Sequence, residues 1–176
     1  GIQNITELLD TTTRLIAERF GFYHVGLLIL DEQKKLAYLQ ASSSAIGAQL
    51  IGQAVRLAFD KRDPLVIVIE QNRPAIMADI EQRNFVPDPT SPLTRSRMVL
   101  PLAIRNNVIG MLDIHSEQPQ AFDIQDAEIL QTVADLAAIS FDNVRLTNET
   151  KSLIAQLEMN TAIQTQRTWS KLTSRQ

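Results

Sequence analysis

The sequence contains no cysteine and only two histidines, His24 and His115. The absence of cysteine excludes disulfide bonds, thiolate metal sites, cysteine nucleophiles and any cofactor attached through sulfur. Two histidines alone do not make a typical metal shell, and both lie at the ends of expected strands, so we interpret them as polar strand ends. We find no catalytic constellation among the remaining polar residues, and we expect a protein that is not an enzyme.

Long hydrophobic runs and an excess of positive charge are also missing. The longest apolar runs, residues 25–30 and 65–69, are far shorter than the ~20 residues that span a bilayer, and no segment resembles a secretory signal. The net charge of -3 offers no basic surface to phosphate backbones. We therefore expect a soluble, cytoplasmic protein with no membrane span and no nucleic-acid partner. Because the chain begins with Gly1 rather than Met, we expect it to be a segment of a longer protein.

The first part of the chain has the pattern of a helix followed by a β-hairpin. Apolar residues recur at helical spacing as far as Phe20, and Gly21 ends this pattern. Residues 22–30 and 36–41 are rich in β-forming residues, and a polar turn at residues 31–34 separates them. This pattern predicts one amphipathic helix and two paired strands.

The middle of the chain gives mixed signals. Residues 42–53 are small and polar and fit a loop or a short helix, whereas residues 54–59 fit a third strand. The run Leu-Val-Ile-Val-Ile at residues 65–69 fits either a buried strand or a helix. The pair Asp63-Pro64 directly before it is typical of a helix N-terminus and favours the helix.

A short strand is expected at residues 75–78, followed by a long irregular segment at residues 79–94. The irregular segment contains the three prolines Pro87, Pro89 and Pro92. A loop of this length inside a compact domain is usually functional or mobile.

The clearest signal is a second hairpin. Residues 98–104 and 108–115 are two apolar runs that flank the polar pair Asn106-Asn107, which is typical of a hairpin buried on both faces. Pro101 has no backbone N–H, so its place in the first run requires a bulge or an unpaired position.

The C-terminal part predicts one long helix. Asp123 is placed to cap its N-terminus, and neither glycine nor proline interrupts residues 121–176. Beyond the expected domain, partly apolar positions continue at heptad spacing: Leu146, Thr150, Leu153 and Leu157. Such a stripe is typical of a parallel helix seam, so the sequence predicts a homodimer formed through the terminal helices.

Three stretches resemble the GAF domain family. They are residues 22–31, the hairpin residues 96–102 with 108–114, and residues 121–126 at the start of the long helix. The resemblance implies an α+β fold with an antiparallel sheet of about six strands. It also implies that the N- and C-terminal helices pack on one face of the sheet, and that pocket-forming loops lie on the other.

The resemblance also sets the expected domain organisation and function. We expect a GAF domain at residues 1–149 and a signalling helix at residues 150–176 that leads to a downstream output domain. Such domains are sensory or regulatory modules of multidomain signalling proteins, typically bacterial, that bind a small molecule and transmit through the C-terminal helix. The alternative is a structural connector that only dimerises and binds no ligand.

Family resemblance bears on cofactors as well. Some GAF domains attach bilin through cysteine, and one enzymatic branch reduces free methionine sulfoxide with cysteines. The absence of cysteine argues against both, and the Asn-Lys-Phe-Asp-Glu set of cyclic-nucleotide-binding members is also missing. We therefore expect no covalent cofactor and an unidentified, non-covalent small-molecule ligand.

Candidate ligand-binding residues lie in and after the long irregular segment. Arg95 and Arg97 are placed to clamp an anion, because a guanidinium presents a planar fork that matches carboxylate or phosphate. The alternative is a solvated loop end whose arginines are neutralised by Asp79 or Glu81. Asp79 and Phe85 are further candidates for a pocket lid. Asp113 shares a strand face with His115, and we assign it no role.

Overall fold

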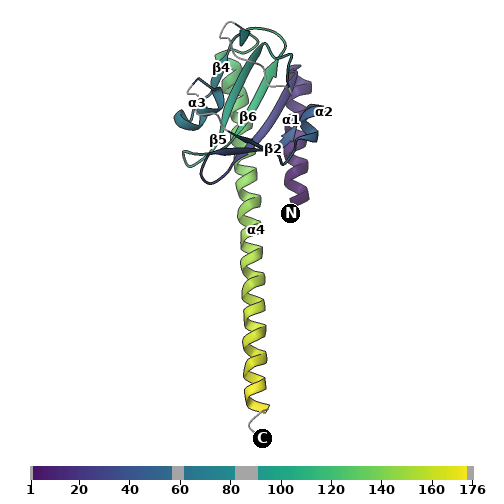
Figure 1. Cartoon of the computed structure of the whole chain (residues 1–176), viewed down its shortest axis with the longest axis vertical. Helices are drawn as coiled ribbons and strands as arrows, with labels where there is room; N and C mark the ends of the chain where they lie inside the picture. Colours follow the sequence, from purple (N-terminus) through teal and green to yellow (C-terminus); the bar gives the residue numbers. More distant parts are fainter. Residues whose placement is uncertain (1, 57–61, 82–90, 174–176) are drawn as a thin grey trace.

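One antiparallel sheet organises the chain (Figure 1). The structure is a computed structural model that describes residues 2–56, 62–81 and 91–173. Within these residues six strands pair in the order β3-β2-β1-β6-β5-β4. The strands are β1 (His24–Leu30), β2 (Leu36–Ser42), β3 (Ala54–Arg56), β4 (Ala75–Met77), β5 (Ser96–Ile104) and β6 (Asn107–Ser116). The helices are α1 (Ile2–Phe20), α2 (Ala45–Gln49), α3 (Pro64–Gln71) and α4 (Ile124–Thr173).

Different helices cover the two faces of the sheet. Alternate residues of a strand point to opposite faces, and the larger core lies on the face covered by α1 and α4. Its fully buried members include Val25, Leu27, Leu100, Leu112 and Leu130. On the other face, α3 packs over a second cluster that includes Leu28, Val68, Val99 and Met111. The predicted fold class, with the terminal helices on one face only, is confirmed.

Local signals account for the helix at residues 64–71, where the sequence also fitted a strand. The Asp63 side chain accepts a hydrogen bond from the Leu65 N–H at 2.9 Å, and Pro64 occupies the first turn. Asn72 ends the helix in the left-handed conformation, with φ of 48°. The predicted helix is confirmed because both of its ends are fixed by capping residues.

The hairpin of β5 and β6 is confirmed, with its turn one residue earlier than predicted. Ile104 pairs with Asn107, so Arg105 and Asn106 form the turn, with φ of 49° and 63°. Two consecutive residues of positive φ give the twist that antiparallel strands need in a two-residue loop. Pro101 lies in register with Met111, and a register shift follows between Leu102 and Ala103.

The helix α4 is continuous over 50 residues. Asp123 and Asp126 cap its start by accepting hydrogen bonds from each other's backbone N–H groups at 2.8 and 2.9 Å. The first turns pack on the sheet, whereas residues 149–171 are exposed and project away from it as a single rod (Figure 1). In the described part of the chain, no helix has both the length and the hydrophobicity that membrane crossing requires.

We predict that the helix-side core carries most of the stability. Leu100 is fully buried, and replacing it with alanine is expected to lower the free energy of unfolding by about 2–5 kcal/mol, through lost burial and a new cavity. Leu93→Ala is the matched control, because Leu93 is 58% exposed and should change stability by about 0.5 kcal/mol or less. Urea unfolding measures both, and equal losses would contradict the assignment of the core.

Candidate functional site

A cavity of about 280 Å³ lies over β1 and β6, on the sheet face opposite α1 and α4. Three leucines, Leu28, Leu39 and Leu50, supply apolar walls, and the segment around α2 forms one side. Polar side chains of His24, Asp113 and His115 also line it. Ligand pockets typically combine apolar walls with a few converging polar groups, in volumes of about 300–1,000 Å³. At about 280 Å³ the cavity lies just below this range and suits a small metabolite.

The register of β1 on β6 brings these polar residues together. His24 pairs with His115, and Gly26 pairs with Asp113. Gly26 keeps the space open, because a Cβ there would lie 3.2 Å from His24 Nε2 and 3.4 Å from Leu39 Cδ1. Any larger side chain at this position would extend into the cavity.

A buried ion pair fixes the polar side of the cavity. Arg97 on β5 donates from Nε to Asp113 Oδ1 at 2.8 Å and from Nη2 to Oδ2 at 2.6 Å. This bidentate contact fixes the orientation of the guanidinium relative to the carboxylate. Burial opposes ionisation of Asp113, but the charges of Arg97 and His115 and their hydrogen bonds outweigh it. The pKa of the Asp113 carboxyl is consequently held well below its ordinary value of 3.8.

Both histidines lie at strand ends, as predicted, and both are buried parts of this site. His115 Nε2 lies 3.1 Å from Asp113 Oδ1, and His115 Nδ1 lies 2.9 Å from the Thr94 hydroxyl. His24 Nδ1 lies 2.9 Å from the Ser44 hydroxyl. The two rings meet edge to face with centroids 5.1 Å apart. Across the described residues, no group of three or more His, Cys, Asp or Glu is placed to hold a metal ion.

The structure places the predicted ligand-binding residues in different surroundings. Arg95 Nη2 lies 3.2 Å from Asp79 Oδ2 and 3.3 Å from Glu81 Oε2, and none of these three residues lines the cavity. Arg97 does not line the cavity itself but contacts Asp113, which does. Phe85 lies outside the described residues. A role for these side chains in ligand binding stays a prediction.

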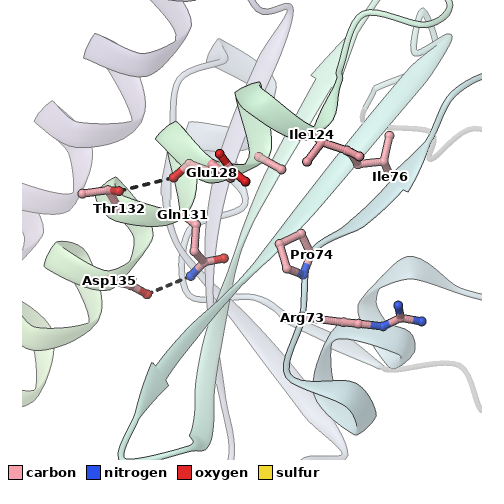
Figure 2. A pocket seen from close by; sticks show the side chains of 9 residues that line it. Arg73, Pro74, Ile76, Ile124, Glu128, Gln131, Thr132 and Asp135 are labelled. Atoms are coloured by element: carbon pink, nitrogen blue, oxygen red, sulfur yellow. Dashed lines mark hydrogen bonds between the residues drawn. The ribbon is translucent and has the colours of Figure 1, made fainter.

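A second hollow of about 520 Å³ lies on the helix side of the sheet, between β4 and the start of α4 (Figure 2). Pro74, Ile76 and Ile124 give it apolar walls, and Gln131 and Asp135 of α4 form a hydrogen bond at its rim (Figure 2). Although it is larger, it contains no buried ion pair or histidine among its described lining residues. We favour the cavity over β1 and β6, because buried ionisable groups converge there.

Comparisons with known proteins agree with the architecture. The sequence model of the GAF domain family matches residues 3–142. A curated relative, GAF domain-containing protein A of Dictyostelium discoideum, is 28% identical over 139 residues, which cover 77% of this chain and 80% of the relative.

Solved structures give the same result. The GAF domain of a phosphoenolpyruvate-protein phosphotransferase from Coxiella burnetii superposes with a TM-score of 0.69 at 17% identity, covering 82% of this chain and 86% of that one. A free methionine-R-sulfoxide reductase from Neisseria meningitidis, solved with its substrate, has a TM-score of 0.66 at 23% identity and 81% coverage of each chain. Because both identities are low, these likenesses concern the fold.

The buried carboxylate predicts a specific pH dependence. The pKa of Asp113 is lower in the folded chain than in the unfolded one, so its ionised form stabilises the fold above the ordinary value of 3.8. This contribution is lost as the pH falls through that value and below it. Asp113→Asn should cost about 3–5 kcal/mol at neutral pH, because it leaves buried positive charge without its partner.

Urea unfolding of wild type and Asp113→Asn from neutral pH down to about pH 3 measures this dependence. The difference between the two proteins should shrink as the pH falls. Asp10→Asn serves as the control, because Asp10 is an exposed residue of α1. A difference that is the same at every pH would contradict the electrostatic explanation.

Proposed function

The chain belongs to the GAF domain family, and from this we propose that it is a sensory module that binds a small molecule in the cavity over β1 and β6. The observation that supports this most is the combination of apolar walls with the buried Arg97–Asp113 pair and His115. A buried ion pair contributes little to stability compared with apolar packing, so its position beside a cavity favours a role in binding. The same cavity favours ligand binding over a purely structural connector.

The likeness to a methionine sulfoxide reductase raises the question of enzymatic activity. That protein is 23% identical to this chain, a level at which only the fold carries over. This chain has no cysteine, so it cannot perform thiol-based reduction with side chains of its own. We therefore propose binding and regulation rather than catalysis.

We further propose that the module is a homodimer formed through its helices. The heptad stripe of Leu146, Thr150, Leu153 and Leu157 continues back into the domain, because Leu136 and Ile139 fall on the same two heptad positions. These two side chains are 60% and 50% exposed. An apolar stripe that extends from the domain into the projecting rod supports a parallel helix pair.

In this proposal, α4 connects the ligand cavity to the dimer. Residues Leu130, Ala134 and Ala138 of its first half are fully buried in the core between α4 and the sheet. The helix then continues without interruption into the exposed rod. A ligand that shifts β6 would move the packed half of α4 and alter the pairing of the projecting half. Residues 1–149 would sense the ligand, and residues 150–176 would transmit to an output domain.

The cavity is tested by a thermal-shift screen with a metabolite library. Compounds that bind the folded chain should raise its melting temperature by mass action. Gly26→Val should abolish these shifts, because the added methyl groups fill the cavity. Ile124→Ala alters the second hollow instead and should leave the shifts intact. A library that gives no shift, or hits lost only in Ile124→Ala, would contradict this site.

The dimer is tested by sedimentation equilibrium. We predict that wild type sediments as a dimer and that the double substitution Leu146→Glu with Leu153→Glu yields a monomer, because like charges would face each other in the seam. Met159→Glu is the matched control, since Met159 is a 63% exposed residue of the same helix that lies off the stripe. A wild-type monomer, or equal dissociation by both variants, would refute the proposed seam.

A further inference from the structure

The projecting half of α4 gains nothing from packing on the domain. Residues 149–171 are exposed along the whole rod, and no described element of the chain covers them (Figure 1). Most of the stability of a helix in a protein comes from packing of one face rather than from intrinsic propensity. Threonine, which recurs along this rod, is a weak helix former. The rod therefore needs a partner that packs along its length.

The heptad stripe of the proposed dimer loses its apolar character after Leu157. Its next positions are Asn160, Gln164 and Arg167. In a parallel pair these residues meet their own copies, so Arg167 would face a like charge. The amide groups of Asn160 and Gln164 would lose their water. Pairing along the heptad positions is therefore unfavourable beyond Leu157.

A second stripe starts on the same residues and continues further. It shares Leu146, Thr150 and Leu157 with the heptad stripe. Between Thr150 and Leu157 it passes through Ile154 rather than Leu153, which gives a repeat of eleven residues. No charged residue lies on it from residue 146 to residue 168, so two copies can meet along it without bringing like charges together. Beyond Leu157 this eleven-residue stripe consists of Thr161, Thr165 and Thr168.

We infer that beyond Leu157 the helix pairs with a second copy of this chain along Thr161, Thr165 and Thr168, so that the seam changes from a seven-residue to an eleven-residue repeat. This inference rests on the proposed homodimer and names the surface that pairs in the far half of the rod. A seven-residue repeat imposes a left-handed supercoil, whereas an eleven-residue repeat gives a right-handed one. The supercoil that forms before Leu157 therefore unwinds beyond it.

The threonine hydroxyls are already satisfied within the helix. Thr161, Thr165 and Thr168 each donate to the carbonyl oxygen four residues earlier, at 2.9 Å. These hydroxyls therefore need no partner across the seam, and the methyl groups remain for contact with the other copy. Asn160 and Gln164 differ in this respect, because an amide carries two donors and an acceptor that burial would have to satisfy.

The shape of the rod favours the same side. A shallow hollow on its surface is lined by Ile154, Leu157, Thr161 and Thr165 of the eleven-residue stripe. The heptad continuation at residues 160, 164 and 167 does not line it. The distance between two packed helices depends on the side chains at their contact. The threonine side of the rod therefore allows a closer approach than a side that carries glutamine and arginine.

Disulfide cross-linking of single-cysteine variants measures the seam. Because the wild-type chain contains no cysteine, each variant reports on one position. Neighbouring residues of a helix point about 100° apart, which allows matched pairs: Asn160→Cys with Thr161→Cys, and Gln164→Cys with Thr165→Cys. We expect the threonine variant of each pair to cross-link at least about fivefold faster under mild oxidation, because a disulfide needs Cα atoms within about 7 Å.

Two further variants calibrate the cross-linking. Leu146→Cys lies on both stripes and should cross-link, whereas Lys151→Cys lies on neither and should not. If Leu146→Cys cross-links and the variants at 160 and 164 are the faster members of their pairs, the inference fails and the homodimer stands. Equal rates within the pairs, or no cross-link in either pair, also overturn the inference. If Leu146→Cys itself does not cross-link, the proposed parallel homodimer fails as well.

Added charge gives a second readout in sedimentation equilibrium. Thr161→Glu places like charges on the inferred seam and should weaken the dimer at least about tenfold. Asn160→Glu introduces the same charge one residue away and should change the dissociation constant by about twofold or less. Both residues are exposed, so thermal melts of the domain should be unchanged. Equal weakening by the two variants, or stronger weakening by Asn160→Glu, would overturn the inference.

Discussion

The antiparallel pairing of β1 with β6 is the constraint on which the rest of the structure depends. Because side chains alternate between faces along each strand, this one register directs Val25, Leu27 and Leu112 into the core beneath the helices. The same register directs His24 and Asp113 to the opposite face. A slip of one residue would exchange the two sets and bury the ionisable groups under α4. Core and site are therefore two consequences of one strand pairing.

The two faces differ in what stabilises them. The helix face is closed by aliphatic packing, which gains free energy roughly in proportion to the apolar area buried. On the cavity face, Arg97 and Asp113 give up their hydration for each other, an exchange that is close to neutral overall. On this face Asp113 also lies 3.1 Å from His115, which lines the cavity.

Much of the fold could be predicted from the sequence, because local chemistry determines it. Asp63 and Pro64 identified a helix where the following five residues alone fitted a strand equally well. The absence of glycine and proline after residue 121 predicted α4. The turn between β5 and β6 was misplaced by one residue, because Arg105 adopts a positive φ that is uncommon outside glycine, asparagine and aspartate.

The site was harder to predict, because no local motif marks it. The register between strands assembles it from residues that are distant in the sequence. His24 and His115 are far apart in the chain, and only their pairing across β1 and β6 brings the rings together. Arg97 was identified as a candidate for a free anion clamp, but its partner Asp113 was assigned no role. The sequence did contain one indication of the site. Asp113 and His115 are two residues apart, so they share one face of a strand whose other residues are mostly apolar.

The proposed function places a ligand on the β1–β6 face of the sheet, opposite the helices. A crystal structure of the protein grown with a bound metabolite tests this most directly. We predict ligand density above Gly26 and beside His115, enclosed by the segment around α2. Density in the hollow beside Ile124, or anywhere on the face covered by α1 and α4, would contradict it.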